Sequence, residues 1–457
     1  MISDIIEYNL SQDIEVNILR KYRILPIKQN NLHILIGTSN IDQDTKDIKH
    51  LFNSPIKFIK IDDIFLEYEY RYLSYKIALY NLAINSIKKN IQEKENLYIL
   101  EFLDIVFEFC IKQNISDIHF ESLKNHIVIR FRLDGVLIEF FKFNKKLYSL
   151  ISAVVKFLAN LDISQKRLPL NGAFSKDILK YSYDFRVSTM PTIYGESIVL
   201  RILDNKNIQK SLSSIGFLQN ELDIIYKNIQ LSQGLILVTG PTGSGKTTTL
   251  YSILNYLNQK SKKIITIEDP VEYKIDGIMQ INLNPQIELD YHTVLKNILR
   301  QDPDILLIGE IRDTLSAKIA IRAALTGHLV IATLHTNDSI ETITRLIDLQ
   351  IEPYLISTTL KMVIAQRLVR KLCSCKIYDE VLNSYKAIGC EKCNLTGYKD
   401  RTIIAEVLEV SRDVAESIYQ NKPIKIKEFN TLKYSAKKLL KNGTISYEEF
   451  VSKVNEI

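Results

Sequence analysis

The stretch Gly240-Pro-Thr-Gly-Ser-Gly-Lys-Thr247 decides the fold of this chain of 457 residues. An apolar run at 235–238 precedes it, and a helical pattern follows from Thr247. A strand, a glycine loop and a helix in this order, with the spacing G-x-x-x-x-G-K-[ST], are typical of a phosphate-binding loop. The backbone N–H groups of such a loop point at the phosphates from a helix N-terminus. The sequence therefore predicts a nucleoside triphosphate site here.

Two side chains of this loop have expected roles. Lys246 is predicted to reach the β- and γ-phosphates of ATP, and the Thr247 hydroxyl to coordinate Mg²⁺. The chain contains only 15 glycines, yet three of them lie within this loop. A glycine turn without a ligand is the alternative interpretation. The predicted nucleotide-binding residues are Gly240, Pro241, Thr242, Gly243, Ser244, Gly245, Lys246, Thr247 and Thr248.

The composition indicates a soluble globular protein with an ample core, since 46% of residues are hydrophobic and 25% are charged. The 59 basic and 53 acidic residues are spread along the chain and give a formal charge of +6. No basic tract with interleaved aromatic residues points to nucleic acid. No apolar run approaches the roughly 18 residues that span a membrane, and the N-terminus does not resemble a secretory signal. We expect a cytoplasmic protein without a transmembrane segment that meets the membrane through partners.

The first two of four predicted segments precede the phosphate loop. Residues 1–95 mix short apolar runs with a Lys/Asn/Glu-rich stretch, which predicts a small N-terminal α/β module and a polar linker. Residues 98–204 predict an α+β domain, with a turn at Asp134-Gly135. Its predicted elements are a helix at 97–113 and strands at 127–133, 182–187 and 196–202.

The third segment, 212–370, alternates apolar strands with helical patterns, which predicts a parallel sheet with helices on both faces. The fourth segment, 371–457, contains four cysteines and then two amphipathic helical patterns. The fold class is therefore α/β. The predicted strands of the third segment are 235–238, 264–267, 305–308 and 329–334.

Two acidic residues at strand ends are candidates for catalysis. Glu310 follows one apolar strand and is predicted to polarise the attacking water, because phosphoryl transfer depends on positioned charge. Glu268 ends the neighbouring strand, at the sheet edge that lines the ligand crevice. With Asp269, it is expected to hold Mg²⁺ through water or to help place the nucleophile. The alternative is a surface acid at a strand end or, for Glu268 and Asp269, a turn before Pro270.

Two histidines flank the predicted strand 329–334. His328 and His335 stand at opposite ends of this strand, so they cannot both face one phosphate. His335 is at the carboxyl end and is predicted to sense the γ-phosphate. A structural histidine at a strand end is the alternative for either residue.

Four of the five cysteines lie close together in the fourth segment. In a reducing compartment such a cluster indicates metal binding before disulfides, and four thiolates complete a tetrahedral Zn²⁺ shell. A vestigial loop with free thiols is the alternative, and Cys110 is expected in the core. The predicted zinc ligands are Cys373, Cys375, Cys390 and Cys393.

Several motifs follow one another along the chain. After the phosphate loop come Glu268-Asp-Pro-Val-Glu272, Leu299-Arg-Gln-Asp-Pro-Asp-Ile305, Gly309-Glu-Ile-Arg-Asp313, Thr326-Gly-His-Leu-Val330, Thr333-Leu-His-Thr-Asn-Asp338 and Gln366-Arg-Leu-Val369. Before it come Ser116-Asp-Ile-His119, Arg130-Phe-Arg-Leu-Asp-Gly135, Lys166-Arg-Leu-Pro169, Arg186-Val-Ser-Thr-Met-Pro191 and Gly195-Glu196. Over about residues 98–457, this set resembles the secretion ATPase family, specifically the type II secretion (general secretion pathway protein E-like) and type IV pilus assembly ATPases.

The resemblance implies a RecA-like P-loop NTPase core preceded by a sensor-like domain. It implies a cytoplasmic homohexamer that hydrolyses ATP in the manner of an EC 7.4.2-type enzyme. The expected partners are an inner-membrane platform protein and a membrane-anchored assembly protein, which the N-terminal module docks. The motor would drive a pilus or pseudopilus in secretion, pilus biogenesis or DNA uptake. Arg186 and Arg201 match the family's arginine fingers, whereas each alone would be interpreted as a solvated strand charge; Arg130 and Arg132 match less well.

Two departures from the family pattern matter. The first cysteine pair is Cys373-Ser-Cys375, where the family usually has Cys-x-x-Cys, whereas Cys390-Glu-Lys-Cys393 follows the pattern. The short N-terminal region lacks the arginine- and leucine-rich pattern with which some relatives bind cyclic di-GMP, so this ligand is not expected. A retraction motor is disfavoured by the cysteines and the N-terminal module. The remaining alternatives are a RecA-like nucleic-acid translocase and a nucleotide-binding adaptor that does not hydrolyse ATP.

Overall fold

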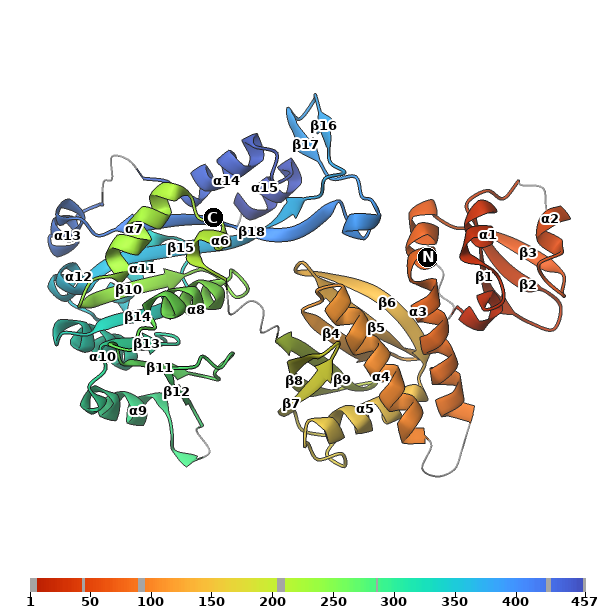
Figure 1. The fold of residues 1–457 in the computed structure, drawn as a ribbon, viewed down its shortest axis with the longest axis horizontal. Helices are drawn as coiled ribbons and strands as arrows, with labels where there is room; N and C mark the ends of the chain where they lie inside the picture. The colour runs from red at the N-terminus through yellow and green to blue at the C-terminus, as the bar shows by residue number, and fades with distance from the viewer. Residues whose placement is uncertain are drawn as a thin grey trace. The chain divides into compact units, whose positions relative to one another are not determined.

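The computed structural model describes residues 6–42, 46–88, 95–203, 210–284, 287–424 and 429–454. These residues belong to two compact units, Met1–Asp204 and Asn205–Ile457 (Figure 1). The first unit contains both segments predicted before the phosphate loop, and the second contains the two that follow. The linker expected near 205–212 lies mostly outside the described residues. Among the described residues, no helix is long and apolar enough to cross a membrane.

The first unit begins with a small α/β module around a three-stranded sheet of order β1-β2-β3. The long helix α3 (Asp63–Lys88) follows the third strand and ends before most of the Lys/Asn/Glu-rich stretch near Asn96 that the sequence analysis interpreted as a polar linker. Residues 89–94 of that stretch lie outside the described residues. The other elements are η1 (Tyr8–Ser11), α1 (Val16–Lys21), β1 (Ile24–Gln29), β2 (Ile34–Thr38), α2 (Lys46–Lys49) and β3 (Ile56–Lys60).

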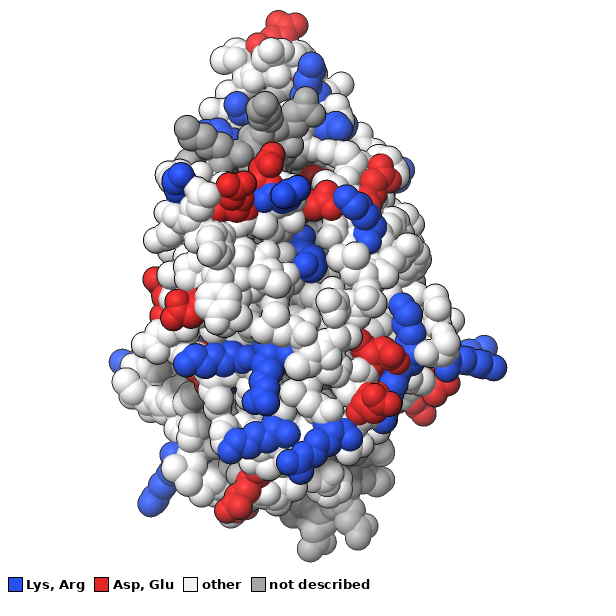
Figure 2. Space-filling view, turned by 90° about the vertical axis from the view of Figure 1, so that its left-hand side faces the viewer, with Lys and Arg blue, Asp and Glu red and all other residues white. Residues whose placement is uncertain are grey.

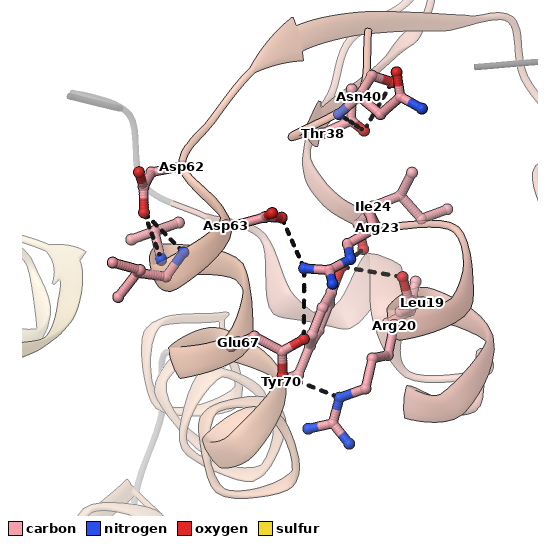
Figure 3. A network of polar contacts seen from close by, with 12 residues as sticks. Leu19, Arg20, Arg23, Ile24, Thr38, Asn40, Asp62, Asp63, Glu67 and Tyr70 are labelled. Carbon is pink, nitrogen blue, oxygen red and sulfur yellow. Dashed lines mark hydrogen bonds and ion pairs between the residues drawn. The ribbon is translucent and has the colours of Figure 1, made fainter. Parts of the chain in front are cut away.

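Polar contacts hold α1 and β1 against the start of α3 (Figure 3). Arg20 pairs with Glu67 at 3.2 Å, and Arg23 pairs with Asp63 at 2.8 Å. The Tyr70 hydroxyl lies within hydrogen-bonding distance of the carbonyls of Leu19 (3.0 Å) and Ile24 (2.9 Å). The tyrosine therefore caps two backbone carbonyls at the end of α1 and the start of β1.

The second half of the first unit is a six-stranded antiparallel sheet of order β6-β5-β4-β9-β8-β7. Alternating residues make one face apolar, and this face packs on two helices. The turn at Asp134-Gly135 has positive φ at both residues, as the sequence predicted. The elements are α4 (Glu95–Lys112), β4 (Asp117–Ser122), β5 (His126–Leu133), β6 (Val136–Asn144), α5 (Leu147–Leu158), β7 (Leu170–Ile178), β8 (Tyr181–Thr192) and β9 (Gly195–Leu203).

A buried ion pair helps to join the module to this second sheet. Lys76 and Glu69 of α3 are 1% and 3% exposed, and their charged atoms are 2.6 Å apart. The Tyr8 hydroxyl donates to Glu69 at 2.7 Å, and its ring lies 5.0 Å from that of Phe141 on β6. Burial lowers the pKa of Lys76, and Glu69 opposes this shift. The module and the sheet thus share one core.

The second unit is a seven-stranded sheet of order β12-β11-β13-β14-β10-β15-β18, parallel except for the antiparallel edge strand β18. β18 lies beyond residue 370, so the sheet continues into the segment predicted as a separate C-terminal region. All four predicted strands are present: β13 and β14 have the predicted bounds, and β10 and β11 differ by at most one residue at either end. The strands are β10 (Gly234–Thr239), β11 (Ile264–Glu268), β12 (Met279–Asn282), β13 (Ile305–Ile308), β14 (Leu329–Leu334), β15 (Leu360–Leu372) and β18 (Tyr398–Glu409).

Helices cover both faces of this sheet, so its central strands are buried in every residue. Alternate residues of each strand enter two separate cores. α14 and α15 pack over β15 and β18 in a third core. The helices are α6 (Leu212–Ile215), α7 (Gln219–Ile229), α8 (Lys246–Leu257), α9 (Tyr291–Ile298), η4 (Leu299–Gln301), α10 (Thr314–Leu325), α11 (Ser339–Asp348), α12 (Pro353–Thr359), α13 (Arg412–Tyr419), α14 (Leu432–Lys441) and α15 (Tyr447–Val454).

Candidate nucleotide site and four-cysteine cluster

The phosphate loop connects β10 to α8, at the carboxyl edge of the parallel sheet. Gly240, Gly243 and Gly245 have φ of 143°, 79° and 90°, a region that side chains rarely adopt. A Cβ at Gly240 would lie 2.4 Å from the carbonyl oxygen of Gln366. The glycines therefore allow the loop backbone to adopt positive φ, and Gly240 also allows it to pack closely against β15.

Lys246 begins α8 and points back over the loop. Its Nζ donates to the carbonyls of Gly240 at 2.7 Å and Pro241 at 3.1 Å. Burial lowers its pKa to about 8, Glu310 opposes this shift, and Arg367 adds to it. Because the lysine is partly desolvated, an anion in the loop would favour its charged form.

Glu310 follows β13 and lies beside two other charged or titratable groups. Its Oε2 accepts from Arg312 Nε at 2.9 Å, and its Oε1 lies 3.5 Å from His335 Nε2. Burial lowers the pKa of His335, and Lys246 lowers it further, which favours the neutral imidazole. The structure therefore brings Glu310 and His335 together at the end of neighbouring strands. His328, at the other end of β14, instead has its Nδ1 2.9 Å from the carbonyl of Ala323.

Glu268, the second acidic residue predicted for the site, is the last residue of β11. It is 6% exposed, and its carboxylate accepts hydrogen bonds from Tyr251 at 2.5 Å, Thr266 at 2.6 Å and Gln280 at 3.3 Å. The Glu268 carboxylate is thus hydrogen-bonded to side chains of α8 (Tyr251), β11 (Thr266) and β12 (Gln280). Asp269 lies 3.6 Å from Arg312, and both residues line a cavity of about 340 Å³ bordered by α9 and α10.

Three site contacts were not expected from the sequence. Gln366 on β15 is fully buried, accepts from Thr249 Oγ1 at 2.8 Å and donates to the Ser244 carbonyl at 2.9 Å. Gln366 therefore links β15 to the phosphate loop and to the first turn of α8. Arg312 pairs with Glu310, and Asn337 contacts Arg367. The motifs contain these residues, but their contacts depend on the register of neighbouring strands.

Arg186 and Arg201 lie in the first unit, on the outer face of its antiparallel sheet. Strand pairing places Arg186 opposite Arg201, Arg201 opposite Asp117, and Asp117 opposite Arg132. Directly opposed residues share one face, so these four side chains form a row across four strands. Asp117 holds Arg201 at 3.0 Å and lies 3.6 Å from Arg132.

The four predicted zinc ligands meet at one point. Their sulfur atoms all lie within 4.8 Å of one another, and three pairs (373–390, 375–393 and 390–393) are 3.8 Å apart. A tetrahedral Zn²⁺ with bonds of about 2.3 Å separates its sulfurs by about 3.8 Å. The residues present therefore fit a Zn²⁺ ion. The sulfur atoms of the short pair, Cys373 and Cys375, also lie within the 4.8 Å limit. The cluster lies next to the hairpin of β16 (Ile377–Asp379) and β17 (Ser384–Lys386) and contains η5 (Glu391–Cys393).

A phosphate loop on a RecA-like parallel sheet, with a carboxylate after β13 at the same edge of the sheet, defines this chain as a P-loop ATPase. The chain belongs to the family described as "Type II/IV secretion system protein", whose model matches residues 92–457. The family match covers the antiparallel sheet, the ATPase core and the four-cysteine cluster.

Known relatives agree with this assignment. The chain is 44% identical to the type II secretion system ATPase E of Vibrio cholerae, over 72% of this chain and 69% of that protein. It is 43% identical to the type II secretion system protein E of Aeromonas hydrophila, over 70% and 67%. It is 39% identical to the protein transport protein HofB homolog of Haemophilus influenzae, over 92% and 89%.

Two solved structures share the fold. The pilus retraction motor PilT with bound ADP has a TM-score of 0.54 and 25% identity, over 77% of this chain and 96% of that one. The ATPase DotB of Legionella pneumophila has a TM-score of 0.61 and 21% identity, over 78% and 96%. The second comparison supports the fold alone.

Proposed function

We propose that this chain is the motor ATPase of a type II secretion, type IV pilus or DNA-uptake system. It hydrolyses ATP as a cytoplasmic homohexamer and drives assembly of a pilus or pseudopilus through a membrane platform protein. The observation that carries this proposal is the approach of Glu310 and His335 at the sheet edge beside Lys246, in a chain 44% identical to a secretion ATPase. The membrane-anchored assembly protein is the proposed partner of the N-terminal module.

The residues of the second unit divide the work of hydrolysis. Lys246 binds the β- and γ-phosphates, and the Thr247 hydroxyl is placed to coordinate Mg²⁺, which neutralises phosphate charge when bound. Glu310 orients the attacking water, and Arg312 holds one of its oxygens. His335, favoured in its neutral form, is close enough to Glu310 to respond to the γ-phosphate. Glu268 positions Tyr251 and β12 rather than the water.

Arg186 and Arg201 supply the remaining charge when the first unit closes on bound ATP. An arginine is always ionised and can bind phosphate oxygens with two N–H groups. The row containing Asp117 supports this role because a carboxylate fixes the Arg201 guanidinium on the outer sheet face. Closure would depend on the γ-phosphate, and its loss would reopen the units, which converts hydrolysis into movement.

Cys373, Cys375, Cys390 and Cys393 would hold one Zn²⁺, which acts as a structural clip between β15 and β18. The cluster lies beyond the last strands of the sheet and contains none of the residues assigned to hydrolysis.

The alternative function is a nucleic-acid translocase, and the distribution of charge bears on the choice between the two functions. On the face of the molecule drawn in Figure 2, lysine and arginine side chains lie among aspartate and glutamate side chains. A translocase requires a continuous basic surface along which the phosphate backbone can run. The 59 basic and 53 acidic residues are spread along the chain, which favours a protein-directed motor.

The function is tested by combining hydrolysis with capture of the partner. The purified chain should hydrolyse ATP with Mg²⁺, and Lys246→Ala should bind ATP weakly. The tagged chain, incubated with membranes of its own organism, should retain the platform protein. Hydrolysis that requires added DNA or RNA and falls steeply with salt would favour the translocase instead. Tight binding of ATP without turnover would indicate an adaptor.

A further inference from the structure

A buried arginine on β15 lies beside the phosphate loop and has no part in the roles assigned above. Arg367 is 2% exposed and follows Gln366, the residue that braces the loop at Ser244 and Thr249. Burying a guanidinium is unfavourable unless it is bound by specific partners. Its contacts therefore indicate what it positions.

Arg367 reaches the loop that carries His335. Its Nη2 donates to the side-chain Oδ1 of Asn337 at 3.1 Å, and its Nη1 donates to the Gln366 carbonyl at 3.4 Å. Asn337 is two residues beyond His335 and is itself exposed. The Asn337 backbone N–H donates to Glu341 at 2.5 Å, so the start of α11 also holds this residue.

The same loop has a second anchor on the strand that leads into the phosphate loop. The Thr336 N–H donates to Thr239 Oγ1 at 3.1 Å, and Thr239 Oγ1 donates to the Thr336 carbonyl at 3.1 Å. Thr239 is the last residue of β10. The His335 loop is thus held on one side by β10 and on the other by β15, the two strands that contact the phosphate loop.

We propose that Arg367 and Asn337 form a positioning link that holds His335 against Glu310 during ATP hydrolysis. The proposal rests on the proposed ATPase function and adds two residues to it. The link joins β15, which packs against Gly240 and Gly245 of the phosphate loop, to the loop after β14. A movement of the phosphate loop on binding ATP would therefore reach His335 through Arg367.

The contacts separate this role from nucleotide binding and from folding. Gln366 bonds to the phosphate loop at Ser244 and Thr249, whereas Asn337 lies at the other end of the contact with Arg367, so ATP affinity should not depend on Asn337. Thr336 keeps its anchor on Thr239 when Asn337 is shortened, so the loop stays attached but loses one of its supports. The expected consequence is a lower kcat with an unchanged Kd.

The experiment is a double-mutant cycle with Asn337→Ala, Arg367→Gln and the combined variant. Each single variant should lower kcat on the order of tenfold, because a charge-assisted hydrogen bond is lost. The combined variant should be no slower than the slower single variant, because both remove one link. The Kd for a fluorescent ADP analogue should match wild type in Asn337→Ala, which keeps the charge of Arg367. Arg367→Lys should behave like Arg367→Gln, since a lysine keeps the charge without the planar fork.

Arg370→Gln is the matched control on the same strand. Arg370 binds Glu449 of α15 through Nε and Nη2 at 2.9 and 2.7 Å, on the C-terminal side of the unit. This variant should lower thermal stability and leave kcat unchanged. If Asn337→Ala turns over ATP like wild type, or if the two losses multiply in the combined variant, the link is wrong. If wild type itself does not hydrolyse ATP, the proposed function fails instead. Because Asn337 is exposed, its variant remains informative even if Arg367→Gln does not fold.

Discussion

The two large sheets of this chain present their functional residues in opposite ways. In the parallel sheet, β10, β13 and β14 are buried in every residue, and the proposed hydrolytic residues Lys246, Glu310 and His335 lie beyond the strand ends. In the antiparallel sheet, β8 alternates buried and exposed residues, and Arg186 lies within the strand itself. A parallel sheet covered by helices on both faces can offer a site only at its edge, whereas a sheet covered on one face can offer a row of charges.

This difference suggests a division of labour between the units. The loops at the sheet edge of the second unit place the phosphate loop, Glu310 and His335 close together, an arrangement suited to binding phosphates and positioning one water molecule. The outer face of the first unit carries guanidinium groups that Asp117 orients. We expect variants in the second unit to affect binding or the chemical step, and variants in the row to affect turnover alone.

The largest effect is expected at the row of the first unit. Arg186→Ala and Arg201→Ala should each lower ATP turnover roughly 10³-fold, because a guanidinium no longer neutralises developing charge in the transition state. ATP binding and the melting temperature should stay near wild type. The measurement combines steady-state hydrolysis with equilibrium binding of ATP. Adding Arg186→Ala subunits to wild-type rings should depress activity more than in proportion to the dose.

Weak ATP binding in these variants would contradict the division of labour, since the row would then belong to the binding site. A strictly linear loss in mixed rings would indicate that the sites fire independently. Wild-type turnover in pure Arg186→Ala would remove this residue from the mechanism.

The second effect concerns the water-positioning carboxylate. Glu310→Gln should lower turnover roughly 10²-fold or more and keep bound ATP, because the phosphate contacts of Lys246 remain. Single-turnover hydrolysis with radiolabelled ATP separates the bound from the cleaved nucleotide. Glu268→Gln is the matched comparison, since Glu268 is bonded to Tyr251, Thr266 and Gln280. If Glu268→Gln lowers ATP turnover as much as Glu310→Gln does, Glu268 also takes part in hydrolysis.

A smaller effect is expected from pH. The pKa of Lys246 is lowered to about 8 without nucleotide, and the phosphates of ATP favour the charged amine. Affinity for ATP should therefore fall as the pH rises through 8, by about eightfold between pH 7.5 and 9. The free energy of unfolding of the protein without nucleotide changes in the opposite sense. Above pH 8 the unfolded chain binds more protons at Lys246 than the folded chain does, so this contribution to stability rises with pH. Calorimetric titrations should be compared with Lys246→Arg, whose weaker binding should show no such dependence. An equal slope in that variant would assign the proton to another group.

The smallest effect on turnover is expected from the metal. Protein purified without chelators should contain one Zn²⁺ per chain, and its removal should speed hydrogen exchange in residues 373–398 more than at the phosphate loop. A metal clip stabilises chiefly the loop that it closes, so hydrolysis should change little. Cys110→Ala is the control for thiol loss, because Cys110 lies in the core of the first unit. Well under one equivalent of metal would count against the site.

The sequence predicted the parallel sheet well because its strands are apolar runs of the right length between helical patterns. The bounds of β13 and β14 were predicted without error. β12, β15 and β18 were not predicted: β12 is short and β18 is an edge strand, and such strands carry weaker patterns, whereas β15 contains the Gln366-Arg-Leu-Val369 motif but was not recognised as a strand. The helix α3, which the sequence analysis did not predict, buries a narrow stripe that includes Leu66, Tyr70 and Leu73.

Sequence motifs also predicted part of the candidate site, because some of its residues stand at short, local spacing. A motif names residues whose spacing is local, as in the phosphate loop, and it also placed Glu310 and His335 at strand ends. It says little about contacts between motifs. The pairing of Glu310 with Arg312, the bonds that occupy Glu268 and the contact of Arg367 with Asn337 depend on how side chains pack across elements.

The sequence by itself determined the class of fold, the phosphate loop and the four cysteines, because each depends on residue type at short spacing. Glycines permit the left-handed loop, and thiolates select a soft metal, in any surrounding structure. Only the tertiary structure decided what each carboxylate contacts and which arginines share a face. Strand register brings Arg186, Arg201 and Asp117 into one row, and burial commits Glu268 to three hydrogen bonds. Both outcomes depend on residues far apart in the chain, whose proximity no local pattern records.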